Sequence, residues 1–181
     1  MSPKPESRGL LLVHTGDGKG KTTAALGMLV RSLGHGHKCA VVQFIKGSQP
    51  TSETLLAGVA SSLGGQLSWE RCGEGFTWRN ADKTRDLELA QEGWAKVRPL
   101  LADPELRFLM LDELNIVLKH GFLDTAQVLA DLQARQPGLH VVLTGRGAPE
   151  AILLAADLVT EMREHKHPYR SGIKAQAGLE F

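Results

Sequence analysis

The chain has 181 residues and a mass of 19.6 kDa, which fits one folded domain better than two. With 42% hydrophobic and 23% charged residues it can fill a core, so neither a disordered protein nor a disulfide-stapled miniprotein is expected. Lys and Arg number 21 against 20 Asp and Glu, and a net charge of +1 gives no support to general binding of nucleic acid or of a membrane surface.

After a flexible tail at residues 1–8, the apolar pattern predicts short strands that alternate with helices. Strands are expected at residues 10–14, 39–44, 107–111, 139–144 and 158–163, and helices at 22–33, 86–101, 124–135 and near 149–156. Strands separated by helices predict an α/β fold with a mainly parallel sheet covered on both faces, in one domain over residues 9–181. Residues 47–80 and 165–181 lack clear periodicity, and we expect such segments at the carboxyl ends of strands, where ligands bind.

The two cysteines, Cys39 and Cys72, do not form a pair with metal-ligand spacing and cannot build a disulfide framework. We expect two reduced thiols in the core of a cytoplasmic protein. The longest apolar runs are far too short to span a bilayer, and the first residues lack the apolar core of a signal peptide.

The strongest motif follows the first predicted strand and precedes the first predicted helix. Three alternating glycines allow the backbone to curl around a phosphate chain, and the helix that follows adds the positive end of its dipole. Lys21 is expected to reach phosphate oxygens, and the Thr22 hydroxyl is expected to bind Mg²⁺. The standard pattern begins with glycine, whereas this loop begins with Thr15. The predicted nucleotide-binding residues of the loop are Thr15, Gly16, Asp17, Gly18, Lys19, Gly20, Lys21, Thr22 and Thr23.

A second motif is the apolar strand that ends in Asp112 and Glu113. Carboxylates at a strand end beside a phosphate loop hold a metal ion directly or through water, although one of them can instead cap the next helix. Spacing alone does not rank the two acids as metal ligands. Arg146, at the end of another predicted strand, is a candidate phosphate contact or a solvated loop residue.

Several features expected of other enzymes are not evident. A kinase or hydrolase needs a residue that takes a proton or orients a water molecule, and no residue announces that role. The pairs His35/His37 and His165/His167 are simple alternations, and we interpret them as surface or loop histidines in preference to metal sites.

Six segments occur together in an order that is specific to one family. They are residues 15–23 (TGDGKGKTT), 41–47 (VVQFIKG), 75–78 (GFTW), 111–115 (LDELN), 142–146 (VLTGR) and 167–176 (HPYRSGIKAQ). From residue 9 to the end, the chain resembles the P-loop-type ATP:corrinoid adenosyltransferases, which act on cob(I)alamin or cob(I)yrinic acid a,c-diamide. The resemblance implies a three-layer, RecA-like P-loop NTPase fold.

The resemblance also implies an activity: transfer of the 5′-deoxyadenosyl group of ATP to the cobalt(I) of a reduced corrinoid, with release of triphosphate, in adenosylcobalamin biosynthesis or salvage. ATP and the corrinoid are then substrates, Mg²⁺ is the cofactor, a flavoprotein supplies electrons and the protein is a homodimer. Phe76 and Trp78 match the positions that displace the lower axial ligand of cobalt, which would make Phe76, Trp78 and Lys21 the catalytic residues.

The chain departs from the family pattern in two places. Many members carry Asn where this chain has Asp17, and longer relatives have an amino-terminal helix that closes over the site.

Two other functions share the phosphate loop and the acids: a small-molecule or nucleoside kinase, which needs a base and makes ADP, and a nucleotide-dependent switch ATPase. Trp69 and Trp94 are expected to be core aromatics.

Overall fold

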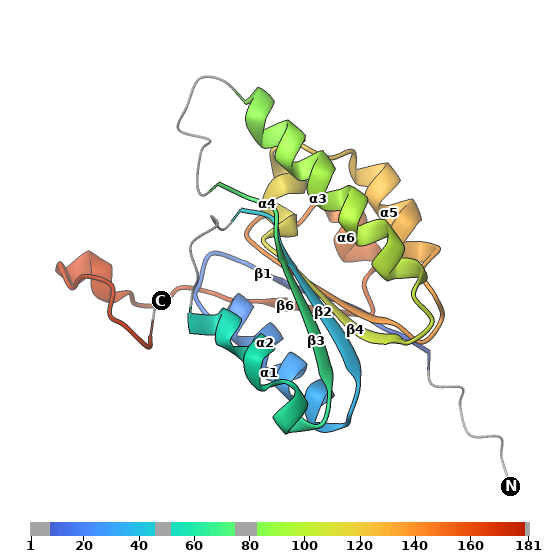
Figure 1. Ribbon diagram of the computed structural model, residues 1–181. Helices are drawn as coiled ribbons and strands as arrows, with labels where there is room; N and C mark the ends of the chain where they lie inside the picture. The colour runs from blue at the N-terminus through green and yellow to red at the C-terminus, as the bar shows by residue number, and fades with distance from the viewer. Residues whose placement is uncertain (1–7, 46–51, 75–82, 180–181) are drawn as a thin grey trace, which may run out of the picture.

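The computed structural model describes residues 8–45, 52–74 and 83–179. Six parallel strands form one sheet in the order β3-β2-β4-β5-β1-β6 (Figure 1). The strands are β1 (Leu11–Thr15), β2 (Lys38–Gln43), β3 (Gln66–Arg71), β4 (Leu106–Asp112), β5 (His140–Thr144) and β6 (Leu158–Glu161). Because all six strands run in one direction, the carboxyl ends of β1, β2, β4 and β5 lie together at the same end of the sheet.

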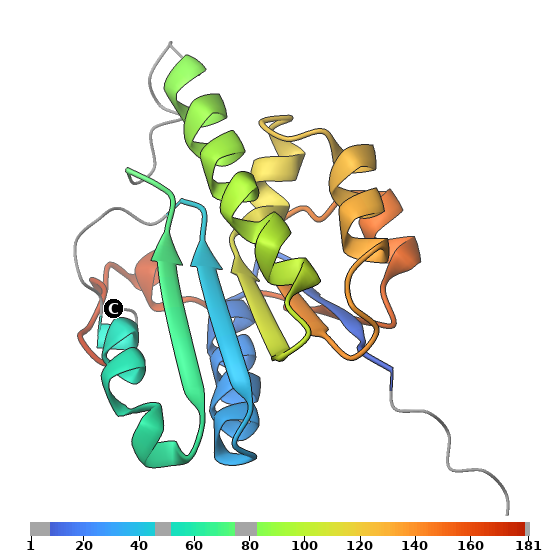
Figure 2. The same cartoon turned by 45° about the vertical axis from the view of Figure 1, so that its right-hand side comes forward.

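Helices cover both faces of the sheet, which gives three layers (Figures 1 and 2). One face carries α1 (Lys21–Gly34) and α2 (Leu55–Val59), and the other carries α3 (Thr84–Ala102), α4 (Leu114–Lys119), α5 (Thr125–Gln133) and α6 (Glu150–Ala155). Short 3-10 helices lie at Ser52–Thr54, Ser61–Leu63 and Pro168–Ser171. The layers confirm the predicted three-layer α/β class. None of the helices in the described segments is long and apolar enough to cross a membrane.

The period of two along each strand divides the core between the two faces. In β1, Val13 packs under α3 to α6, whereas Leu12 packs under α1. The central strands are apolar on both faces, and β4 and β5 show almost continuous burial because helices cover them on both sides. The two cysteines, Cys39 and Cys72, are free and buried, as predicted. Burial raises the pKa of both thiols.

The structure places β3 and α2 within residues 47–80, where we predicted no element. The sequence of β3, QLSWER, alternates exposed and half-buried positions because the strand lies at the edge of the sheet. The six-residue helix α4 also escaped prediction, because so short a helix shows too little periodicity. The other predicted strands and helices are present, with ends that shift by a few residues.

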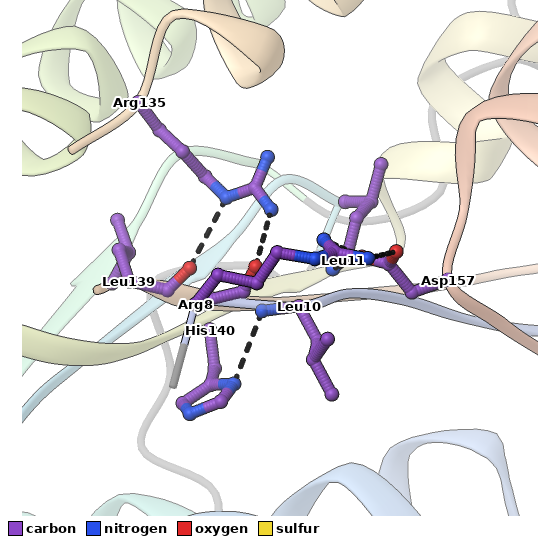
Figure 3. Close-up of polar contacts among 8 residues, drawn as sticks. Arg8, Leu10, Leu11, Arg135, Leu139, His140 and Asp157 are labelled. Atoms are coloured by element: carbon purple, nitrogen blue, oxygen red, sulfur yellow. Dashed lines mark hydrogen bonds and ion pairs between the residues drawn. The ribbon is translucent and has the colours of Figure 1, made fainter. Parts of the chain in front are cut away.

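At the amino-terminal ends of the strands, charged side chains bind the backbone (Figure 3). Arg135 donates to the carbonyls of Leu139 and Gly9, at 3.1 Å each, and to that of Leu132 at 2.7 Å. Asp157 accepts from the backbone N–H of Leu11 at 2.9 Å and pairs with Arg8. We call Arg8, Arg135, His140 and Asp157 the amino-end cluster; it joins the start of β1 to the starts of β5 and β6.

Candidate nucleotide-binding site

The loop between β1 and α1 has the backbone of a phosphate cradle. Gly16 and Gly20 adopt φ values of +91° and +107°, which side-chain-bearing residues rarely adopt. Gly20 is also the N-cap of α1 and makes no side-chain cap, so the first amides of this 14-residue helix are directed into the loop. The glycines thus allow a tight turn that ends at the positive pole of a helix.

The chain that leaves β6 supports this loop from behind. The N–H of Met162 donates to the carbonyl of Thr15 at 2.8 Å, and the N–H of Gly18 donates to the carbonyl of Met162 at 2.7 Å. A Cβ on Gly18 would stand only 2.7 Å from the carbonyl carbon of Arg163. The middle glycine is therefore needed for close packing of two backbones. The amide of Gly18 donates to the Met162 carbonyl, so this one of the loop amides does not face a phosphate.

Lys21 lies inside the curl of the loop. Its Nζ donates to the carbonyls of Gly16 at 2.7 Å and Gly18 at 2.5 Å, and the side chain is buried. Burial lowers the pKa of the Lys21 ammonium, and the nearby charge of Arg146 lowers it further; the carboxylates of Glu113 and Asp17 oppose both. Charged groups of both signs from three loops therefore act on Lys21.

Asp112, at the end of β4, is fully buried and accepts hydrogen bonds on both carboxylate oxygens. Oδ1 accepts from the hydroxyls of Thr22 at 2.9 Å and Thr144 at 2.7 Å, and Oδ2 accepts from Nε2 of Gln43 at 2.9 Å. Three donors thus satisfy the oxygens of this buried carboxylate, which would be costly to bury without partners. Asp112 therefore joins the first turn of α1 to the ends of β2 and β5.

Glu113 occupies a different environment from its neighbour. Its backbone is left-handed, with φ +63°, and Thr144 supports this conformation because its hydroxyl oxygen accepts the Glu113 N–H at 3.0 Å. Among the described residues Glu113 is the one non-glycine with positive φ. Its carboxylate packs against Gly145, where an added Cβ would stand 3.1 Å from Oε2, and it also acts on Lys21. Backbone strain of this kind persists where the structure over-determines it, commonly at functional sites.

These oxygen atoms fit a magnesium ion. The Thr22 hydroxyl gives its one hydrogen to Asp112, so the lone pairs of its oxygen remain for a cation. Glu113 adds a carboxylate near Lys21, and hard oxygen ligands are those that Mg²⁺ prefers. The two predicted acids thus differ: Asp112 accepts from protein donors on both oxygens, whereas the Glu113 carboxylate lies against Gly145 and its charge acts on Lys21.

The remaining predicted residues lie around this centre. Asp17, Lys19, Thr23 and Arg146 are exposed, with Asp17 and Arg146 near enough to Lys21 to shift its pKa. Thr15 is buried, and its hydroxyl oxygen accepts the N–H of Ala148 at 3.2 Å, which ties the loop to the end of the β5 connection. Phe76 and Trp78 lie outside the described residues.

Comparison with known proteins identifies the family. Residues 7–181 match the family model described as ATP:corrinoid adenosyltransferase BtuR/CobO/CobP. The chain belongs to this family. It is 51% identical to a corrinoid adenosyltransferase of Pseudomonas aeruginosa over 97% of this chain and 85% of that protein. It is 47% identical to one of Sinorhizobium sp over 100% and 84%, and 39% identical to Corrinoid adenosyltransferase CobA of Salmonella typhimurium over 97% and 87%.

Four residues of this adenosyltransferase-family site were not predicted as functional. Gln43 and Thr144 bind Asp112, and Trp69 binds Gln43 through its indole N–H at 2.9 Å. Trp69 packs partly on the core, as predicted, but also has this polar contact. Asn115 is fully buried and donates to the carbonyls of His14 at 3.3 Å and Gly145 at 3.1 Å. Gln43 and Thr144 end apolar strands and Asn115 lies two residues after Glu113, and those positions were the available signal. Trp69, in the half-exposed strand β3, offered no such signal.

Proposed function

We propose that the protein transfers the 5′-deoxyadenosyl group of ATP to the cobalt(I) of a reduced corrinoid and releases triphosphate. The observation that carries this proposal is the group of Lys21, Thr22 and Glu113 at a phosphate loop, in a chain of the ATP:corrinoid adenosyltransferase family. The relatives at 39–51% identity are themselves named corrinoid adenosyltransferases.

The chemistry accounts for the lack of an evident base. Cobalt(I) attacks the ribose 5′ carbon with its own electron pair, so a cobalt–carbon bond forms while the carbon–oxygen bond to the α-phosphate breaks. The leaving triphosphate takes the bond electrons, and no proton has to be removed. The protein must position two substrates and offset negative charge, which are contributions of several kcal/mol each in well-formed sites.

Lys21 and the amino-terminal amides of α1 are the groups that offset this charge. The ammonium is buried with its donors toward the inside of the loop, where a low dielectric strengthens its attraction for phosphate oxygens. Arg146 adds positive charge nearby, and its exposed position lets it approach a bound triphosphate. Phosphate oxygens would replace the Gly16 and Gly18 carbonyls as acceptors for Lys21.

Magnesium belongs to this proposal as the cofactor. Thr22 and Glu113 would hold the ion, and Asp112 would act through the hydroxyl of Thr22. When bound, Mg²⁺ supplies positive charge that neutralises the phosphates. The finer features that the family resemblance implies also stay proposals: Phe76 and Trp78 against the corrinoid, a flavoprotein reductant, a homodimer and a cytoplasmic location. The domain proposed to carry these activities spans residues 9–181.

One assay tests the proposal. The protein is mixed without oxygen with Mg-ATP and chemically reduced cob(I)alamin, and the corrinoid spectrum and the phosphate products are followed. We expect an alkyl-cobalt spectrum and one triphosphate for each corrinoid consumed. ADP as the product would contradict the proposal and favour a kinase or a switch ATPase.

The same assay tests the two aromatic residues. With Phe76→Ala and Trp78→Ala combined, we expect activity on pre-formed cobalt(I) to be retained and activity to fall when cobalt(II) must be reduced in the site. The reason is that loss of the lower ligand makes cobalt(II) easier to reduce, whereas cobalt(I) needs no such step. An equal loss under both conditions would contradict the proposed role.

A further inference from the structure

A directed chain of hydrogen bonds runs across three strands of the sheet to the candidate site. Nε1 of Trp69 on β3 donates to Oε1 of Gln43 on β2 at 2.9 Å, and Nε2 of Gln43 donates to Oδ2 of Asp112 on β4 at 2.9 Å. Gln43 and Asp112 are register partners in neighbouring parallel strands, and both are fully buried. The chain continues through Oδ1 of Asp112 to the hydroxyl of Thr22 at 2.9 Å.

Elementary chemistry sets the direction of each bond in this chain. An indole N–H can only donate, so the atom of Gln43 that faces Trp69 must be the carbonyl oxygen. The amide nitrogen of Gln43 must then face Asp112, where it donates to a carboxylate that can only accept. Trp69 therefore selects one of the two amide orientations of Gln43, and the selected one satisfies Oδ2 of Asp112.

The orientation of the Gln43 amide matters because it determines which groups bind the other carboxylate oxygen of Asp112. With Oδ2 bound to Gln43, Oδ1 faces the two hydroxyls of Thr22 and Thr144. The Thr22 hydrogen is bound by Asp112, so its oxygen lone pairs are directed elsewhere. The reversed Gln43 amide would place its oxygen against the Asp112 carboxylate, and the repulsion would turn that carboxylate away from Thr22.

We propose that Gln43, oriented by Trp69, is a positioning residue for the binding of magnesium-bound ATP. It acts through Asp112 on the Thr22 hydroxyl and does not itself touch the nucleotide. This inference rests on the proposed function, because it assigns the metal to Thr22. Its chemical basis is general: groups that orient metal ligands without contacting the ion commonly change metal affinity by about 10- to 100-fold when they are removed.

The test measures ATP affinity by calorimetry twice for each protein, once with saturating Mg²⁺ and once with EDTA. The ratio of the two dissociation constants is the gain in affinity that magnesium brings. Gln43→Met keeps a similar volume and removes both hydrogen bonds, and we expect the gain to fall by about tenfold or more. The affinity in EDTA should stay within about threefold of the wild-type value, since Lys21 and the loop amides are unchanged. Equal losses under both conditions would overturn the proposal.

Gln136→Met is the matched control. Gln136 donates from Nε2 to the carbonyl of Leu106 at 2.6 Å and accepts the N–H of Gly138 at 2.8 Å, at the opposite end of the sheet. The substitution therefore makes the same chemical change and lowers stability without approaching the loop. Its magnesium gain should equal that of the wild type. A gain reduced as much as in Gln43→Met would make the effect a general loss of stability and would overturn the proposal.

If Gln43→Met folds poorly, Trp69→Phe tests the same chain of hydrogen bonds. The ring remains but the donor is lost, so the Gln43 amide is held by its bond to Asp112 alone, and the magnesium gain should fall by about threefold, the size of one neutral hydrogen bond. Trp94→Phe, which removes an indole bond to Asp131 on the other face, is the control and should leave the gain unchanged. An unchanged gain in Trp69→Phe would overturn the role of Trp69. A wild-type protein without any magnesium gain would instead count against the proposed function, which separates the two failures.

Discussion

The two ends of the sheet both carry buried or half-buried charged groups, and they use them differently. At the amino-terminal ends, Arg135 donates to three backbone carbonyls, among them that of Leu139, and Asp157 accepts from a backbone N–H and pairs with Arg8. Figure 3 shows the bond to Leu139 and the contacts of Asp157. At the carboxyl ends, Lys21 lies inside a loop of glycines, and the charge of Glu113 acts on it. Charged side chains at the amino-terminal end bind backbone groups of the protein itself. Those at the carboxyl end surround the candidate ligand-binding site.

The difference follows from the direction of the strands. In a parallel sheet the connection that leaves each carboxyl end enters a helix, so helix amino termini and loops gather there. The amino-terminal ends receive chain from helix carboxyl termini, where carbonyls need donors, and Arg135 supplies one to Leu132 in the last turn of α5. We therefore expect substitutions at the amino end to change stability and those at the carboxyl end to change activity.

The largest effect is expected for Lys21→Met. The buried ammonium is the main fixed positive charge near the leaving triphosphate, so kcat should fall by about 100-fold or more. Lys38→Met is the control at the other end, where Lys38 pairs with Asp103 at 2.9 Å and Glu105 at 3.2 Å; it should retain full kcat. The triphosphate that ATP releases in the presence of pre-reduced cobalamin measures kcat for both variants. If Lys21→Met kept more than a tenth of wild-type kcat, the carboxyl end would not be the active end.

Substitutions of the two acids at the end of β4 should cause different defects. Glu113→Gln should raise the Mg²⁺ concentration for half-maximal activity by about tenfold, because it removes a charged ligand, with little change in stability. Asp112→Asn should lower the free energy of unfolding by about 2 kcal/mol, because three donors face an amide that presents its own hydrogens. Magnesium titration and urea unfolding measure these effects. The reverse assignment of defects would show that Asp112 is the direct ligand.

At the amino end, Arg135→Met should lower the free energy of unfolding by about 2 kcal/mol and leave kcat unchanged. Three backbone carbonyls lose a charged donor, and hydrogen bonds to charged groups are worth more than neutral ones. Urea unfolding measures the stability, and the triphosphate assay at a temperature where the variant is folded measures kcat. A large fall in kcat in the folded variant would break the division between the two ends.

The smallest effect is expected for Asp157→Asn, and it should depend on pH. The hydrogen bond from Arg8, then that from the Leu11 N–H, holds the pKa of Asp157 below its ordinary value of 3.8. A carboxyl with a lowered pKa stabilises the fold fully above its unfolded pKa, and this stabilisation is lost as the pH falls through the folded value. The Tm of the wild type should exceed that of the variant at pH 6, and the difference in Tm should shrink below about pH 4. A constant difference would assign the effect to packing.

The sequence allowed prediction of most of the fold, and the roles of the predicted site residues stay predictions. Apolar periodicity marks α1, a nearly continuous apolar run marks β4, and the glycine spacing marks the loop with Lys21. The edge strand β3 could not be predicted, because half-exposed positions alternate with exposed ones and only the pairing with β2 makes it a strand. Local pattern carries no information about such a partner.

The partners of Asp112 could not be predicted from the sequence for the same reason. Gln43, Thr144 and Thr22 lie 69, 32 and 90 residues from Asp112 along the chain, and only the sheet order brings them together. The different roles of Asp112 and Glu113 also depend on a backbone conformation, φ +63° at Glu113, that no propensity predicts for a glutamate. Spacing therefore indicated a pair of acids, and the structure distinguishes them.

The most direct measurement of the division between the two ends is amide hydrogen exchange of the wild-type protein with and without Mg-ATP. Binding at the loop should slow exchange in residues 16–23, 112–115 and 144–147, which line the carboxyl ends of β1, β4 and β5. Residues 9–11 and 135–140 at the amino end should exchange at the same rate in both states. Protection that is equal at both ends, or confined to the amino-end cluster, would contradict the assignment of the nucleotide to the carboxyl end.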